Sequence, residues 1–237
     1  EDMKTIGSTI IMLALASSLF ADNGKELKLA SPDGTHEIVF YQKQVSPAVN
    51  ELCYRVDYKS QPVVNESRAG LELDNRIWEM ALGVRNLKQP ACWMDNLEVD
   101  SVTYQPETNL TWQPLYGERS SVRDHYRAGT LCLSKKDNSG YRLNIEVRAY
   151  NEGVAFRYFF PEHPKAIFHK VVGDLTEYAL PAGTKAWTEQ WAQAFFERLN
   201  IDDIKHPVER ALTFELPNGK WAALADADVD DWCLTKY

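Results

Sequence analysis

A run of acidic residues near the end of the chain is the first place where residue types and spacing could do chemistry. Asp226, Asp228 and Asp230 follow the Asp-x-Asp-x-Asp pattern that opens an EF-hand calcium loop. Such a loop needs glycine at its sixth position and a bidentate glutamate at its twelfth. This chain has Asp231 and Tyr237 there. The pattern therefore predicts a solvated acidic connector rather than a metal loop.

Side chains that could transfer protons come next. Two carboxylates cleave glycosidic bonds with inversion at separations of about 6.5–9.5 Å and with retention near about 5–5.5 Å. The sequence alone does not bring two carboxylates together, so it predicts no catalytic pair. His125, His163 and His169 could carry protons together with a glutamate, which keeps a sugar epimerase of the mutarotase type as an alternative. For His125, a structural hydrogen bond is the preferred interpretation.

The elements that must position these side chains are mostly strands. Apolar and polar residues alternate, as in strands with one buried face, within residues 26–29, 36–40, 52–58, 131–133 and 143–150. Turn-forming residues separate such segments at 31–34, 137–140, 151–153 and 217–219. Many short strands with this punctuation favour an antiparallel sandwich.

Helical signals are few. The best covers residues 188–200, where Trp191, Ala194, Phe195 and Leu199 could share one face. An irregular excursion between strands is the alternative interpretation. No repeat or Pro/Ser-rich linker divides the chain, so one large domain is expected.

The bulk composition excludes some partners. A chain of 237 residues with 44% hydrophobic content can bury a substantial core. Its formal net charge of -8 disfavours nucleic acid, whose binding depends on neutralising phosphates. Cys53, Cys92, Cys132 and Cys233 allow three disulfide pairings. Their wide spacing leaves buried free thiols as an equal alternative, and no Cys-x-x-Cys pair indicates a zinc site.

The first 21 residues have the pattern of a secretory leader. Met3 and Lys4 precede an apolar stretch over residues 6–16, and small residues lead to Ala21. We expect cleavage after Ala21 and a periplasmic or secreted location, with Glu1 and Asp2 extraneous to the leader. The apolar stretch is shorter than the roughly 20 residues that a membrane-spanning helix needs. No membrane association is therefore expected after the leader is removed.

Four phrases along the chain carry a family resemblance. The run 146–161, Glu-Val-Arg-Ala-Tyr-Asn-Glu-Gly-Val-Ala-Phe-Arg-Tyr-Phe-Phe-Pro, resembles a hairpin in the N-terminal sandwich of glycoside hydrolase family 97. Residues 112–126, residues 180–197 and residues 212–227 resemble further stretches of that family in the same order. The resemblance implies an all-β, antiparallel β-super-sandwich of the galactose mutarotase-like type over residues 22–237. It also implies that the catalytic (β/α)-barrel lies downstream, outside this chain.

The resemblance also implies site residues. In that family a carboxylate from the sandwich joins barrel glutamates around a calcium ion, and the matching position is Glu197, with Glu189 as the fallback. Calcium takes six to eight oxygen ligands, so one carboxylate does not hold it alone. Phe196 stands where the family has tyrosine. Trp187 and Trp191 flank the segment expected to face the barrel and are predicted to stack on sugar, although core packing is the commoner role of tryptophan.

The expected function follows from the same resemblance. Family members hydrolyse α-glucosidic or α-galactosidic bonds with the help of calcium, and the sandwich buttresses the barrel and contributes to substrate binding. The chain alone is expected to bind α-linked oligosaccharides at most and to hydrolyse nothing, since the catalytic residues belong to the barrel. A free-standing carbohydrate-binding module and the epimerase are the alternatives.

Overall fold

The computed structural model describes residues 25–74, 91–92, 96–135, 140–163, 168–227, 229, 232 and 235–237. Within these ranges the chain is built from antiparallel strands, and its single helical element is a 3₁₀ turn, η1 (Ile201–Asp203). The predicted all-β class is confirmed. The predicted leader, residues 1–21, lies outside the described residues.

The first sheet is a four-stranded meander. Its strands are β1 (Glu26–Ala30), β2 (His36–Ser46), β3 (Val49–Tyr58) and β4 (Gln61–Arg68), paired in chain order. The strands predicted over residues 26–29, 36–40 and 52–58 are confirmed. The turn after β1 is closed by Gly34, which donates its N–H to the Ser31 carbonyl at 2.9 Å and has φ of 73°. That backbone conformation favours glycine.

The second sheet has the order β11-β10-β9-β7, with β8 paired to the free half of β9. Its strands are β7 (Leu97–Tyr104), β8 (Thr108–Trp112), β9 (Val122–Lys135), β10 (Arg142–Tyr150) and β11 (Gly153–Phe159). In β10, Leu143, Ile145 and Val147 are buried while the residues between them reach the outer face. The predicted alternation over 143–150 is therefore confirmed.

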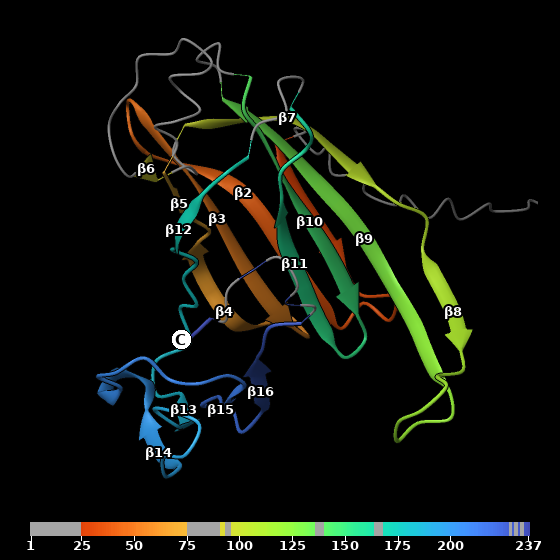
Figure 1. Ribbon diagram of the computed structural model, residues 1–237, viewed down its shortest axis with the longest axis vertical. Coiled ribbons are helices and arrows are strands. Elements are labelled where there is room, and N and C mark those ends of the chain that lie inside the picture. The colour runs from red at the N-terminus through yellow and green to blue at the C-terminus, as the bar shows by residue number, and fades with distance from the viewer. Residues whose placement is uncertain are drawn as a thin grey trace, which may run out of the picture.

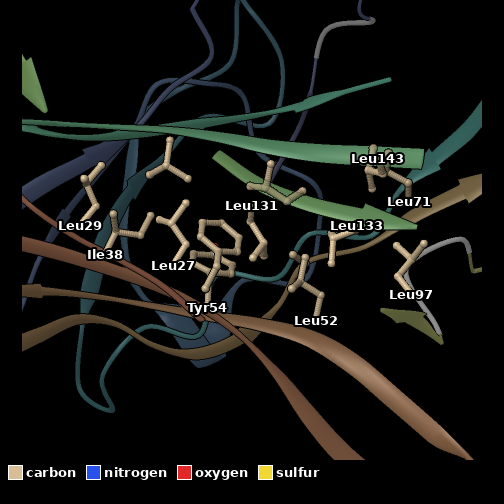
Figure 2. Packing of buried hydrophobic residues seen from close by; sticks show 14 of the residues in the cluster. Leu27, Leu29, Ile38, Leu52, Tyr54, Leu71, Leu97, Leu131, Leu133 and Leu143 are labelled. Carbon is tan, nitrogen blue, oxygen red and sulfur yellow. The ribbon is translucent and has the colours of Figure 1, made fainter. Parts of the chain in front are cut away.

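The main core lies between these two sheets (Figure 2). Strand β1 contacts β9 and β10, and β2 contacts β10 and β11. Phe40 of β2 stacks on Tyr54 of β3 at 5.2 Å and meets Phe156 of β11 edge-on at 5.2 Å, so aromatic packing joins the sheets. Tyr54 donates its hydroxyl to the Glu177 carbonyl at 2.6 Å, because a buried hydroxyl needs a partner. Each such side chain contributes roughly 1.5–3 kcal/mol on burial.

Two smaller sheets complete the fold. One pairs β12 (Val171–Asp174), β5 (Leu71–Leu73) and β6 (Ala91–Cys92). The other, called here the small sheet, has the order β14-β13-β15-β16, with β13 (Lys185–Thr188), β14 (Glu197–Asn200), β15 (Leu212–Glu215) and β16 (Trp221–Leu224). It lies beside the sandwich at the opposite side from β8 (Figure 1).

The small sheet has its own buried cluster. Its members are Ala186, Val208, Leu212, Phe214 and Leu216. Val63 and Leu180 pack against both this cluster and the main core. Backbone hydrogen bonds between Val208 and Tyr237, at 2.7 and 3.0 Å, attach the described end of the chain to this region.

The helix predicted over residues 188–200 is wrong. Residues 185–188 and 197–200 are paired strands, β13 and β14, and the segment between them is irregular with one turn, in which Ala194 donates its N–H to the Trp191 carbonyl at 2.8 Å. Leu199 is half-buried in β14, whereas Trp191 and Phe195 are exposed. A helix with these apolar residues on one face would have no surface to pack against. The segment instead forms two paired strands joined by a loop.

Cys53 is a buried free thiol and Cys132 a half-buried one. The structure does not describe the side chain of Cys92, nor Cys233 at all. No helix among the described residues is long and apolar enough to cross a membrane.

Candidate functional site

The small sheet carries the residues that the sequence analysis selected, and its register decides which way they face. Directly opposed residues of antiparallel strands share a face, and the pairs here are Trp187 with Arg198 and Thr188 with Glu197. Thr188 is buried with Ala186 on the inner face, whereas Trp187 is on the outer face. Glu197 and Trp187 therefore project from opposite faces of the sheet, Glu197 at the exposed edge strand.

The outer face holds a three-part stack. The Trp187 and Trp221 rings lie 4.4 Å apart at an interplanar angle of 30°. The Arg198 guanidinium lies 5.0 Å from the centre of the Trp187 ring and is ion-paired with Glu215. In the sheet order, Arg198 and Trp221 approach β13 from opposite sides. The Trp187 ring is therefore covered on both sides, and the outermost ring is Trp221, which is 58% exposed.

The loop between β13 and β14 concentrates exposed aromatic side chains. Trp191 is 55%, Phe195 93% and Phe196 69% exposed. Monomeric proteins rarely leave large apolar patches in water unless they meet a ligand or another surface. Glu189 at the start of this loop is half-buried, and its carbonyl accepts the Glu209 N–H at 2.7 Å. This aromatic loop is thus anchored at its first residue and exposed towards its end.

Glu197 follows this loop directly. Its carbonyl accepts a hydrogen bond from the Thr188 hydroxyl at 3.3 Å, which fixes the backbone. The carboxylate itself is exposed and makes no hydrogen bond or ion pair with the residues that the structure describes. Those residues contain no group of three or more His, Cys, Asp or Glu side chains able to hold a metal ion. Glu197 fits the role of one hard oxygen ligand among several from elsewhere.

His125 does not come together with His163 and His169. The Nε2 atom of His125 lies 2.7 Å from a Glu107 carboxylate oxygen, as the preferred interpretation predicts. His169 instead stacks on Phe160 at 4.4 Å and meets Tyr141 edge-on. Tyr141 accepts a hydrogen bond from the backbone N–H of Lys135 at the far end of β9. At about 3.3 Å per residue, His125 and Lys135 lie roughly 30 Å apart along β9, which disfavours a proton-transfer site shared by His125 and His169.

The acidic run is described only in part. Asp226 accepts the Thr235 backbone N–H at 3.3 Å, and its carboxylate lies 3.9 Å from Nε of Arg210. Asp226 therefore helps to attach the described end of the chain to the small sheet. Asp228, Asp230 and Asp231 lie outside the described residues.

Comparison with known proteins gives this arrangement a context. A family model described as glycosyl-hydrolase 97 N-terminal matches residues 29–236. The chain belongs to this family. The resemblance recognised in the four phrases is confirmed, and the matched range includes the sandwich, the small sheet and Glu197.

Individual relatives of this glycoside hydrolase 97 N-terminal domain are much longer proteins. This chain is 26% identical over 178 residues to a retaining α-galactosidase of Bacteroides thetaiotaomicron. The match covers 75% of this chain and 22% of that enzyme. A glycoside hydrolase family 97 enzyme of Pseudoalteromonas sp. strain K8, in complex with acarbose, matches with a TM-score of 0.68 and 23% identity, covering 81% of this chain and 27% of that one. A glycoside hydrolase family 97 enzyme (E480Q) of the same strain, in complex with panose, matches with the same TM-score and identity.

A β-arabinopyranosidase also shares the fold, with a TM-score of 0.64 and 15% identity over 83% of this chain and 31% of its own. The structural likenesses establish the fold alone. The family 97 N-terminal domain therefore spans between about a fifth and a third of these relatives, and most of each relative lies outside the matched region.

Two residues of the small sheet were missed by sequence reasoning. Trp221 and Arg198 become recognisable only when the strand order brings them to Trp187. The alternation Trp-Ala-Ala-Leu over residues 221–224 could have indicated that Trp221 and Leu224 face opposite ways. The sequence did not indicate which residues would contact the Trp187 ring.

Proposed function

We propose that this chain is the N-terminal carbohydrate-binding and buttressing domain of an exported, calcium-dependent α-glycosidase. The observation that carries the proposal is the family match over residues 29–236, together with relatives that are glycosidases several times longer. The exported location, periplasmic or secreted, is supported by the leader pattern of residues 1–21. Mass spectrometry that finds a mature N-terminus at Asp22 would support it.

The aromatic loop and Glu197 are the surface proposed to meet the catalytic barrel. Three exposed aromatic rings precede an exposed carboxylate that has no partner among the described residues. Covering Phe195 and Phe196 would stabilise the contact between domains by removing apolar area from water. The same contact would bring Glu197 beside groups that this chain lacks.

Calcium is proposed as a cofactor of the complete enzyme only. Glu197 would supply one carboxylate oxygen, with Glu189 as the fallback. The ion would supply electrophilic stabilisation of negative charge. The contribution of this chain is to hold the carboxylate on a paired strand whose backbone Thr188 fixes. Since one carboxylate is too few for a calcium site, neither tight calcium binding nor hydrolysis is expected of the chain alone.

Sugar contact is proposed for Trp191 of the aromatic loop and for Trp221 of the small sheet. Each presents a largely exposed indole, and indole rings offer an apolar face with a polar edge. Trp187, covered by Arg198 and Trp221, would act by holding Trp221 in place rather than by touching the ligand. The ligand class, an α-linked oligosaccharide, is supported by the relatives named with panose and acarbose.

The proposal is tested in the longer polypeptide encoded by the reading frame that contains this chain. Glu197→Gln should raise the calcium concentration needed for half-maximal hydrolysis of nitrophenyl α-glucoside or α-galactoside by at least about tenfold, because it removes a charged ligand. Glu189→Gln is the matched control and should leave the calcium requirement unchanged. An unchanged requirement in Glu197→Gln with a raised one in Glu189→Gln would transfer the role to Glu189. If neither variant responds, the calcium role fails.

A free-standing carbohydrate-binding module is the second candidate function. The exposed rings of Trp191 and Trp221 favour it, because sugar stacking needs no barrel. A reading frame that stops directly after Tyr237, with saturable binding of maltooligosaccharides by the chain, would support this alternative and exclude the glycosidase proposal. Faster anomer interconversion by the chain, lost in His125→Ala, would instead indicate an epimerase.

A further inference from the structure

A groove of about 720 Å³ is lined by parts of β8, β9 and β10. Strand β8 lies on the side of the molecule away from the small sheet (Figure 1). The walls of the groove are residues 105–110, before and within β8, and Glu146 to Arg148 of β10, and its floor is formed by β9. The volume falls within the range of about 300–1,000 Å³ typical of small-molecule sites. None of its residues was selected from the sequence as a ligand contact.

The groove originates in an irregularity of the sheet. Strand β7 pairs with β9 as far as Tyr104 opposite Gly129, and β8 resumes with Thr108 opposite Tyr126. The β7–β8 side therefore has one residue more than β9 over this stretch, as in a β-bulge. The lining from β9 includes Ala128 and Gly129, whose side chains are small or absent. Bulges of this kind are common beside binding sites.

The carboxylates on the two walls are held in place. Glu107 receives hydrogen bonds from Arg127 at 3.0 Å and lies 2.7 Å from His125 Nε2. These contacts lower the pKa of Glu107, that of His125 being the larger cause. On the other wall, Arg157 donates to Glu146 at 2.7 Å. A carboxylate oxygen accepts more than one hydrogen bond, so both groups can still accept from a ligand.

The donors are held in the same way. The Arg148 guanidinium lies 4.6 Å from the centre of the Tyr126 ring and donates to the Tyr150 hydroxyl at 3.4 Å. Gln105 donates its side-chain N–H to the Thr130 hydroxyl at 3.2 Å. Arg148 is nevertheless exposed and has further N–H groups to offer. Side chains already ordered lose little entropy when a ligand binds.

The charges of the groove balance locally. Glu107 and Glu146 are ion-paired with Arg127 and Arg157, and the negative field of Asp124 acts on Arg148. Neither wall therefore presents an uncompensated carboxylate to attract a cation. The groove combines ordered donors and acceptors with apolar surface from Leu110 and Tyr126, which suits a neutral ligand rich in hydroxyl groups.

We propose that this groove is a second saccharide site, which binds a neutral pyranose chain independently of the small sheet. The choice of ligand class rests on the proposed function, because the relatives are named as enzymes or complexes of sugars. Hydroxyl groups donate to Glu107 and Glu146 and accept from Arg148, while a C–H face of the sugar lies against Leu110 and Tyr126. The site retains an oligosaccharide on the sandwich and leaves the surface near Glu197 free.

The test is a titration of the isotope-labelled chain with panose and with maltotriose, followed by amide chemical shifts. Binding in the groove shifts amides within residues 105–110, 126–130 and 146–148. Arg148→Met keeps the length of the side chain and removes its donors, and should weaken the response of these amides at least about tenfold. Arg142→Met is the matched control, since Arg142 is exposed on the same face of β10 but outside the groove. It should bind like the parent chain.

Trp221→Ala separates this inference from the proposed function. Groove amides that respond in Trp221→Ala and not in Arg148→Met support the groove as a site of its own. A response confined to the small sheet, lost in Trp221→Ala and intact in Arg148→Met, overturns the groove and leaves the proposed function standing. An unperturbed spectrum at saturating sugar overturns the groove and the sugar-binding part of the proposed function together. The spectrum of each variant reports whether it is folded.

Discussion

The interior of the large sandwich and the outer face of the small sheet hold their aromatic side chains differently. In the sandwich, Phe40 and Tyr54 are almost fully buried between two sheets. In the small sheet, Trp187 and Trp221 stack on the outer face, and Trp221 remains exposed. Apolar rings inside a core stabilise the fold, whereas ordered rings in water are available to bind something else. The core of the sandwich therefore serves as the scaffold, and the outer face of the small sheet is the recognition surface that we propose.

The two cores support this division. Among the described residues, nineteen buried side chains form the main cluster and five form that of the small sheet. A core of five residues is too small for independent stability. The small sheet must depend on its attachment through Val63, Leu180 and the pairing of Val208 with Tyr237.

The largest expected effect tests whether the sandwich is the stable unit. Phe40→Ala removes a ring that contacts both Tyr54 and Phe156, and should lower the free energy of unfolding by about 3–5 kcal/mol. Urea denaturation followed by circular dichroism measures this loss. Because Phe40 joins the two sheets, amide protection should fall throughout the sandwich.

Phe214→Ala is the counterpart in the small sheet, since Phe214 is also almost fully buried. Hydrogen exchange should lose protection in β13 to β16 while β2, β9 and β10 keep theirs, because regions of few buried contacts open separately. Equal loss of protection across all strands in both variants would mean that the two regions unfold as one unit. The small sheet would then not be a separate, less stable region than the sandwich.

An effect of intermediate size is the dependence of the stability of the sandwich on pH, through His169. Burial, with a smaller contribution from His163, lowers the pKa of His169 from its ordinary value of 6.5 to about 4. The folded protein thus holds His169 neutral at pH values where the unfolded chain binds a proton. Stability is then fully present above about pH 6.5 and falls as the pH drops towards 4. With allowance for solvent screening, the loss should be about 1–2 kcal/mol.

His169→Phe removes the titrating group and retains an aromatic ring against Phe160 and Tyr141. Urea midpoints measured from pH 7 to pH 4 should fall less steeply in this variant than in the parent chain. Identical slopes would exclude His169 as the source of acid sensitivity.

The sequence predicted the scaffold better than the recognition surface, for a physical reason. Strands such as residues 143–150 are specified locally, because alternation determines which face is buried. The segment 188–200 was wrongly predicted as a helix, because the spacing of Trp191, Ala194, Phe195 and Leu199 suits one face of a helix. The fold offers no surface that such a helix could cover. Only the pairing of residues 185–188 with 197–200 reveals two strands.

The candidate site divides in the same way. Glu197, Trp187 and Trp191 were selected through the family resemblance, but strand register alone shows that Trp187 and Glu197 face opposite ways. The groove is formed by residues 105–110, 126–130 and 146–148. No local pattern joins these three segments, since a bulge and two registers bring them together. Chemistry carried by one segment is predictable, and chemistry assembled across a sheet is not.

The smallest expected effect examines the stack on the small sheet itself. Arg198→Gln removes both the guanidinium above Trp187 and the ion pair with Glu215, contacts worth together about 1 kcal/mol at an exposed site. Thermal unfolding followed by tryptophan fluorescence measures the loss, and the Trp187–Trp221 pair should become less ordered, with a change in emission before unfolding begins.

The matched variant is Arg157→Gln in the sandwich, because Arg157 lies over Phe159 at 5.7 Å and is ion-paired with Glu146. It should lose similar stability without changing tryptophan emission. If Arg198→Gln also leaves the emission unchanged, the order of Trp221 does not depend on the stack. The proposal that the small sheet is a preformed recognition surface would then be wrong.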